Sequence, residues 1–127
     1  MLKATNTASA PEAIGHYSQA ITCGNLLLCS GQIPLDPVSM EVVGDNVTAQ
    51  AEQVMKNVGA LLAANGIGFE RVAKATCFLT DMADFAAFNE VYAKYFTAEP
   101  KPARSTVAVR SLPRGVLCEV EVIAGLG

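Results

Sequence analysis

The chain has 127 residues, of which 51% are hydrophobic and 17% charged, and its net charge at pH 7 is −3. This length predicts a single domain over residues 1–127 with a sizeable core. Because the nine Lys and Arg residues are scattered, the sequence argues against nucleic-acid binding. No apolar run reaches membrane-spanning length, and no basic segment precedes an apolar one at the N-terminus, so we expect a cytoplasmic protein with no membrane association.

The four cysteines, Cys23, Cys29, Cys77 and Cys118, form no CxxC pair and lie in strand-like segments. We interpret them as buried, reduced thiols rather than as disulfides or metal ligands. A zinc site would need a tighter ligand cluster, and the single histidine, His16, stands apart in the sequence from all four. The sequence therefore predicts no metal site. A Cys-His nucleophile pair stays open as an alternative, although no spacing favours one.

The N-terminal part of the chain is expected to form a hairpin. Residues 1–15 are small and polar and indicate an irregular segment, after which strands are expected at 17–23 and 26–30 around a Gly-Asn turn. Gly31 interrupts the second strand, which is typical of a bulge or of a close approach of the backbone to another group. Ser30 and the Gly31 amide would then be free hydrogen-bond donors.

Two amphipathic helices flank a strand in the middle of the chain. Apolar residues recur at helical spacing from Val47 until Asn65-Gly66 supplies a stop, and a strand is expected at 71–79. A second helix is expected at 85–96, where aromatic residues at helical spacing are interpreted as core. The side chains expected to point outward from the first helix are Gln50, Glu52, Gln53 and Lys56.

Residues 102–110 and 116–124 both alternate as strands, and the Pro and Gly between them predict a hairpin loop. Period two places Arg104 and Thr106 on the face opposite the valines, and the valine face is interpreted as core. Matching the apolar faces of the two strands puts Arg104 and Glu119 together on the other face.

An arginine beside a glutamate suits the hydrolysis of a small substrate that carries a carboxylate. A guanidinium is a planar fork that clamps a carboxylate through two hydrogen bonds, and a nearby Glu can orient or deprotonate water. A solvated sheet face with salt bridges would produce the same alternation, so the residues alone leave both interpretations open.

The order of elements is strand pair, helix, strand, helix, strand pair. This order predicts an α+β fold, a two-layer sandwich with both helices on one face of one mixed sheet. The other sheet face would carry apolar residues without a cover, so we expect it to pack against copies of the chain with cyclic symmetry. A pocket between subunits would follow.

Several motifs resemble the RidA (YjgF) family, in register over essentially the whole chain. The most specific are the Ser-Gly-Gln-Ile-Pro and Pro-Ala-Arg-Ser motifs. The segments that carry the resemblance are Gly15-His16-Tyr17-Ser18-Gln19-Ala20, Ser30-Gly31-Gln32-Ile33-Pro34, Gln50-Ala51-Glu52-Gln53 with Asn57-Val58, Phe85-Ala86-Ala87-Phe88-Asn89, Pro102-Ala103-Arg104-Ser105, and Leu112-Pro113 followed by Glu119-Val120-Glu121.

The resemblance implies a chorismate-mutase-like fold, a homotrimer with clefts between subunits, and a deaminase activity without metal or organic cofactor. Members of this kind hydrolyse reactive enamines and imines, such as 2-aminoacrylate, 2-iminobutanoate and 2-iminopropanoate, to 2-keto acids and ammonia. By the family pattern Arg104 binds the substrate carboxylate and Glu119 positions or activates water. The positions expected to line the cleft are Tyr17, Ser30, Gly31, Asn89 and Thr106.

Two residues depart from the family pattern, and two other functions remain open. His16 replaces a common proline, which frees a backbone amide and loosens the entry to Tyr17. Thr106 replaces a common cysteine, and we expect activity to survive this change because the chemistry needs no thiol there. Family members are also described as endoribonucleases that block translation, although the acidic balance here argues against that role. A module that senses a metabolite without turning it over is a further alternative.

Overall fold

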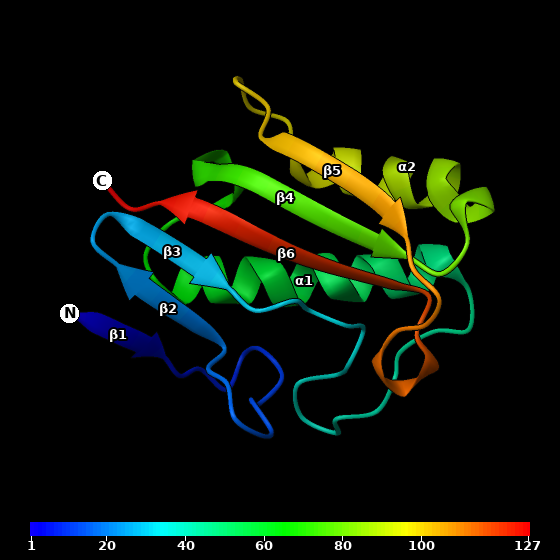
Figure 1. Ribbon diagram of the computed structural model, residues 1–127, viewed down its shortest axis with the longest axis horizontal. Helices are drawn as coiled ribbons and strands as arrows, with labels where there is room; N and C mark the ends of the chain where they lie inside the picture. Colours follow the sequence, from blue (N-terminus) through cyan, green and yellow to red (C-terminus); the bar gives the residue numbers. More distant parts are fainter.

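The computed structural model describes residues 1–127 and consists of one six-stranded mixed sheet with two helices on one face (Figure 1). The strand order is β1-β2-β3-β6-β4-β5, and β4 with β5 is the parallel pair among otherwise antiparallel ones. This confirms the predicted two-layer α+β fold. Neither helix is long and apolar enough to cross a membrane. The strands are β1 (Leu2–Thr5), β2 (Ala20–Cys23), β3 (Leu26–Cys29), β4 (Val72–Leu79), β5 (Ala103–Ala108) and β6 (Cys118–Gly125).

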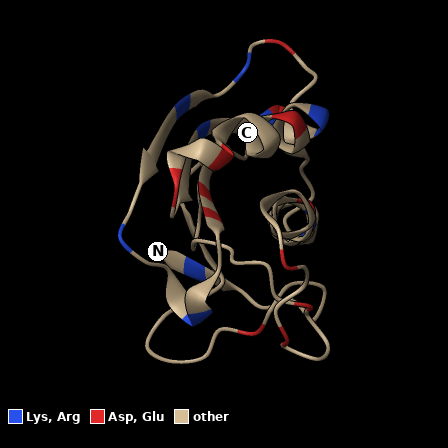
Figure 2. Ribbon diagram, turned by 90° about the vertical axis from the view of Figure 1, so that its right-hand side faces the viewer, with Lys and Arg blue, Asp and Glu red and all other residues tan.

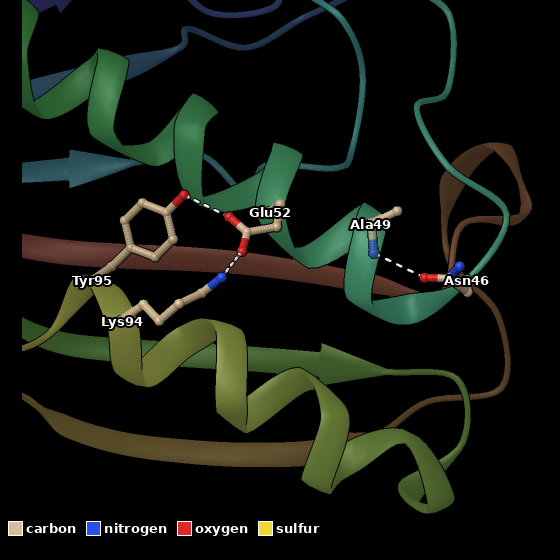
Figure 3. Close-up of polar contacts among 5 residues, drawn as sticks. All are labelled: Asn46, Ala49, Glu52, Lys94 and Tyr95. Atoms are coloured by element: carbon tan, nitrogen blue, oxygen red, sulfur yellow. Dashed lines mark hydrogen bonds and ion pairs between the residues drawn. The ribbon is translucent and has the colours of Figure 1, made fainter.

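Helix α1 (Val47–Ala64) begins and ends where its capping residues predict. The Asn46 side chain accepts a hydrogen bond from the Ala49 amide at 2.9 Å (Figure 3), and Asn65 caps the other end. Gln50 is a correction to the predicted outward face, because its buried side chain accepts from the Leu117 amide at 2.7 Å. Gln50 thus ties α1 to the segment that leads into β6.

Helix α2 (Phe85–Tyr95) follows a short 3-10 turn and packs beside α1. Glu52 on α1 joins the two helices, since it accepts from the Tyr95 hydroxyl at 2.8 Å and forms an ion pair with Lys94 (Figure 3). Burial and the bond to Glu52 raise the pKa of Tyr95 to about 12. The hydroxyl therefore remains a donor at any ordinary pH.

The core fills the space between the sheet and the two helices. It contains the inward faces of β3, β4 and β6 together with the apolar stripes of α1 and α2. The largest fully buried side chains are Phe88, Leu27, Met55, Leu61, Leu62 and Leu79. The other side of the sheet has no cover within the chain, and we call it the open face. Its exposed apolar side chains include Leu26, Leu28, Val107 and Ile123.

Two predictions about the strands are wrong. Residues Leu2–Thr5 lie in the predicted irregular segment but form β1, an edge strand that pairs with β2. The predicted hairpin between β5 and β6 does not form either. Helix α2 carries the chain back so that β5 adds to β4 in parallel, and β6 then enters the sheet between β3 and β4. The Pro and Gly residues of the presumed hairpin instead form a 3-10 turn, Pro113–Gly115.

The predicted faces of β5 are also inverted. In the parallel pair Arg104 lies opposite Ala75 and Thr106 opposite Cys77, and both partners belong to the buried face of β4. Because paired residues share a face, Arg104 and Thr106 point to the helix side and Val107 to the open face, where it is 44% exposed. Alternation separates two faces but does not say which one the helices cover, and the apolar open face misled the interpretation.

All four cysteines are free thiols, but only three are buried. Burial raises the pKa of Cys29 and Cys118 to about 12 and that of Cys77 to about 11, so these thiols are protonated and poor nucleophiles. Cys23, at the end of β2, is exposed, which corrects the prediction that all four are buried.

Candidate functional site

Arg104 leaves the edge strand β5 and reaches over helix α2. Its Nη1 donates to the Asn89 Oδ1 at 2.6 Å, and its Cζ lies 4.5 Å from the centre of the Tyr92 ring and 5.5 Å from that of Phe85. A guanidinium has five N–H donors, and this one donates to a single group of the chain. The remaining donors are available to a ligand.

These contacts follow from the local sequence. Phe85, Asn89 and Tyr92 are separated by four and three residues, so they share the side of α2 that faces β5. Next to them lies a cavity of about 410 Å³, which we call the Arg104 cavity. Its lining residues are Asn89, Tyr92, Ala93, Phe96, Lys101, Pro102 and Arg104.

Thr106 lies two residues beyond Arg104 on the same face of β5, opposite Cys77. Its hydroxyl is buried and has no hydrogen-bond partner, and the same is true of the Tyr92 hydroxyl. These two are the only unpartnered buried side-chain oxygens or nitrogens in the chain. Both belong to elements that hold Arg104, so the unsatisfied polar groups of the fold are concentrated at this site.

Glu119 stands on the open face of β6, opposite Phe78. Its half-buried carboxylate accepts no hydrogen bond from the chain, and desolvation followed by repulsion from Glu121 raises its pKa above the usual value. A carboxylate in this state holds a proton more readily than a solvated one does. A raised pKa also makes the charged carboxylate a stronger base.

The backbone at Gly31 lies against the Glu119 side chain. The Gln32 amide and carbonyl pair with Val120 at 2.8 and 3.1 Å, which lays the 31–32 segment along β6. A Cβ on Gly31 would lie 2.1 Å from the Glu119 Oε2, so the position excludes every other residue type without movement of the carboxylate. The Gly31 N–H donates to no group of the chain, as its interruption of the strand predicts.

Ser30 is not the free donor expected from the sequence. Its amide donates to the Gln19 carbonyl at 2.9 Å and its hydroxyl to the Ser18 carbonyl at 2.6 Å. Tyr17 nearby is 55% exposed, and its hydroxyl accepts from the Ile14 amide at 3.3 Å. The neighbouring His16 is exposed.

Tyr17, Ser30, Gly31 and Glu119 line one cavity of about 690 Å³, which we call the Glu119 cavity. Its other walls come from residues 11–14, the 32–40 loop, the turn before β6 and β6 itself. They include two more carboxylates, Glu12 and Glu121, as well as Arg114. The carboxylates outnumber the single cation of this lining.

The predicted site residues therefore form two groups. Arg104 with Asn89 and Thr106 lies on the helix side of the sheet, whereas Glu119 with Tyr17, Ser30 and Gly31 surrounds the other cavity. The expectation that Arg104 and Glu119 share a face is wrong, because it took the valine faces of both strands as core, whereas only that of β6 is buried. The roles of the individual residues remain predictions.

The sequence interpretation missed Tyr92 as a contact of Arg104. The aromatic spacing of α2 assigns Tyr92 to the core, and it is in fact buried. Its position three residues after Asn89 was the available signal, since the two side chains then share one helix side.

The chain is similar to known proteins over almost its full length. A sequence model of the family described as Endoribonuclease L-PSP matches residues 7–126. Reactive Intermediate Deaminase A, chloroplastic, from Arabidopsis thaliana is 48% identical over 121 residues, which cover 95% of this chain and 64% of that protein.

Two solved structures have the same fold. A protein of unknown function of the Rid family, YyfA from Yersinia pestis, superposes with a TM-score of 0.96 at 42% identity and covers 98% of this chain and 99% of its own. E. coli TdcF with bound serine superposes with a TM-score of 0.91 at 40% identity, covering 98% and 99% of the two chains. On the strength of the family match and these relatives, the chain belongs to the L-PSP family, also known as the RidA (YjgF) family.

Proposed function

We propose that the protein hydrolyses reactive enamines and imines that carry a carboxylate, such as 2-aminoacrylate, 2-iminobutanoate and 2-iminopropanoate. The products are 2-keto acids and ammonia. The observation that carries the proposal is a guanidinium with unused donors in one cavity, together with a half-buried carboxylate of raised pKa in another. The name of the Arabidopsis thaliana relative supports the same class of reaction.

Arg104 supplies the anchor for the substrate carboxylate. Asn89 and the aromatic rings of α2 fix the guanidinium, so its free N–H groups present a preorganised fork to a planar anion. E. coli TdcF, a structural relative, binds serine, a small molecule that carries such a carboxylate.

Glu119 supplies the base for the water. An imine carbon is already electrophilic, so the enzyme has to orient a water molecule and take one of its protons. An enamine first tautomerises to the imine. The water oxygen bonds to the imine carbon while Glu119 takes one proton, which then passes to the nitrogen to give a carbinolamine. The hydroxyl proton of the carbinolamine moves to the nitrogen, the C–N bond breaks, and ammonia and the keto acid are released. The free Gly31 N–H beside Glu119 offers a fixed donor to this site.

Because Arg104 and Glu119 lie on opposite faces of the sheet, we infer that each cleft takes Arg104 from one copy and Glu119 from the next. Such a head-to-tail interface closes into a ring when its rotation allows, and a homotrimer is the proposed ring. The exposed apolar side chains of the open face, Leu28, Val107 and Ile123, favour burial between copies. A monomer mass by light scattering at micromolar concentration would remove this basis.

A cytoplasmic location agrees with four free thiols.

The deciding experiment follows imine decay. Purified protein is mixed with an amino-acid dehydratase and its substrate, and the absorbance of the imine is recorded against the uncatalysed decay. The proposal expects faster decay with the parent protein and no acceleration with Glu119→Gln. Unchanged decay with the parent, combined with tight keto-acid binding, would indicate a metabolite sensor instead.

The same preparation can be tested for RNA cleavage, because the family description includes that activity. Figure 2 shows Lys and Arg spread over separate elements. A nucleic-acid surface would instead require them to gather along one path. We expect no cleavage above that of a Glu119→Gln preparation.

A further inference from the structure

The Tyr92 ring forms the floor beneath the Arg104 guanidinium. Tyr92 is 7% exposed, and the Arg104 Cζ lies 4.5 Å from its ring centre, well within the distance of about 6 Å at which a cation is attracted to an aromatic face. Phe85 is farther away, at 5.5 Å. The guanidinium therefore has one close aromatic contact, one longer one, and a single hydrogen bond, to Asn89.

The floor is itself held rigidly. The ring centres of Tyr92 and Phe96 are 4.5 Å apart, and those of Tyr92 and Phe88 are 6.0 Å apart, so Tyr92 is the middle member of an aromatic row along α2. Phe88 and Phe96 are both buried. A guanidinium that packs on this ring is held in place by a core side chain and moves less than a free surface side chain would.

The hydroxyl of Tyr92 contributes nothing visible to this arrangement. It is buried without a hydrogen-bond partner, and burial raises its pKa to about 12, so it is neutral. A buried hydroxyl without a partner destabilises a fold. The ring of Tyr92 thus holds Arg104, whereas its hydroxyl destabilises the fold. Substitution can remove the hydroxyl alone or the ring with it.

We propose that Tyr92 is a positioning residue, whose ring face holds the Arg104 guanidinium with its free N–H groups toward the cavity. The inference rests on the proposed function of Arg104 as the carboxylate anchor. Since the ring acts on ground state and transition state alike, its loss should raise KM and leave kcat nearly unchanged. A partly desolvated cation–π contact corresponds to about a 5- to 30-fold change in affinity.

The first test compares three variants in the full-length protein. Tyr92→Leu removes the ring, and Tyr92→Phe removes only the hydroxyl. Tyr95→Leu removes a different tyrosine of α2, which donates to Glu52 and packs at a tilt against Phe69 with the ring centres 5.2 Å apart. We expect Tyr92→Leu to raise both KM for the imine and Kd for 2-oxobutanoate about 5- to 30-fold. Tyr92→Phe should keep both values and melt at the same or a higher temperature, and Tyr95→Leu should leave Kd unchanged.

A second test covers the case in which Tyr92→Leu does not fold. Phenylalanine analogues with one, two and three ring fluorines at position 92 weaken the negative ring face stepwise with little change of shape. A stepwise rise of Kd with fluorine number supports the proposal. A constant Kd across the series overturns it, as does a Tyr95→Leu variant that loses as much affinity as Tyr92→Leu.

An Arg104→Met variant separates this inference from the proposed function. If Arg104→Met binds 2-oxobutanoate as the parent does, the carboxylate anchor itself is wrong and both proposals fail. If Arg104→Met loses binding while the fluorinated series is flat, Arg104 remains the anchor and only the role of Tyr92 is refuted.

Discussion

The approach of Gly31 to Glu119 gives the sharpest prediction about catalysis. A Cβ at position 31 would stand 2.1 Å from the Glu119 Oε2, whereas ordinary contacts begin at 3.4 Å. In Gly31→Ala the carboxylate oxygen therefore has to move by about 1.3 Å or more, and a displacement of about 1 Å can cost 10²-fold in rate. We expect kcat to fall by about 10²-fold, up to the 10⁴-fold that loss of a general base can cost.

The assay measures imine decay and 2-oxobutanoate affinity in parallel. Gly125→Ala is the matched control, because it changes a glycine in the same strand as Glu119 where a Cβ would meet nothing within 4 Å. We expect the control to keep the parent rate. In a Glu119→Gln background, Gly31→Ala should add little further loss, since both changes disable one group. A Gly31→Ala protein with parent kcat would refute the assignment of Glu119 as the base.

Three further predictions concern the anchor, the base and the thiols. Arg104→Lys keeps the charge but loses the fork, and should cost about 1.5–3 kcal/mol of ligand binding without a change in oligomer mass or melting temperature, as titration and light scattering can check. Desolvation is the main cause of the raised pKa of Glu119, and repulsion from Glu121 adds to it. Glu121→Gln removes only the repulsion, so the acidic limb of the pH–rate profile should move part of the way to lower pH; a limb that stays in place would contradict this. Reductant should leave the melting temperature unchanged because all four thiols are free, and a shift of several degrees would reveal a disulfide.

The raised pKa of Glu119 also fixes the sign of a stability effect. A carboxyl whose pKa is higher in the folded state than in the unfolded chain favours folding while it is protonated, and this contribution is lost as pH rises from the unfolded value through the folded one. Above this pH range the charged carboxylate of Glu119 lowers the free energy of unfolding. Glu119→Gln should therefore melt at a higher temperature than the parent at neutral pH, and the difference should shrink in acid.

Local signals in the sequence predicted the helices well. The bounds of α1 follow from Asn46, which accepts from the Ala49 amide, and Asn65, whose side chain donates to the Leu61 carbonyl. Both contacts lie within one turn of the helix ends, so local sequence suffices to place them. The same is true of Gly31, where a broken strand pattern correctly indicated a close approach, although the partner could not be known in advance.

Long-range pairing could not be derived in this way. Whether β5 pairs with β6 or with β4 depends on the crossover through α2, and the turn residues near Pro113 are compatible with either path. The valines of β5 suggested that their face was core, whereas the pairing with β4 puts Arg104 opposite Ala75 on the buried face. The apolar open face therefore led to the wrong side of the sheet for Arg104. Leu2–Thr5 likewise became a strand only because β2 offered it an edge.

The placement of Arg104 and Glu119 on opposite faces of one sheet has a consequence for the genetics of the protein. In the proposed assembly each cleft takes Arg104 from one chain and Glu119 from its neighbour, so a single chain would not contain a complete site. Two chains that are each inactive, one altered at Arg104 and the other at Glu119, should then complement each other when they are expressed together. Some mixed clefts would receive both intact residues, so the co-expressed mixture of two inactive variants would regain activity.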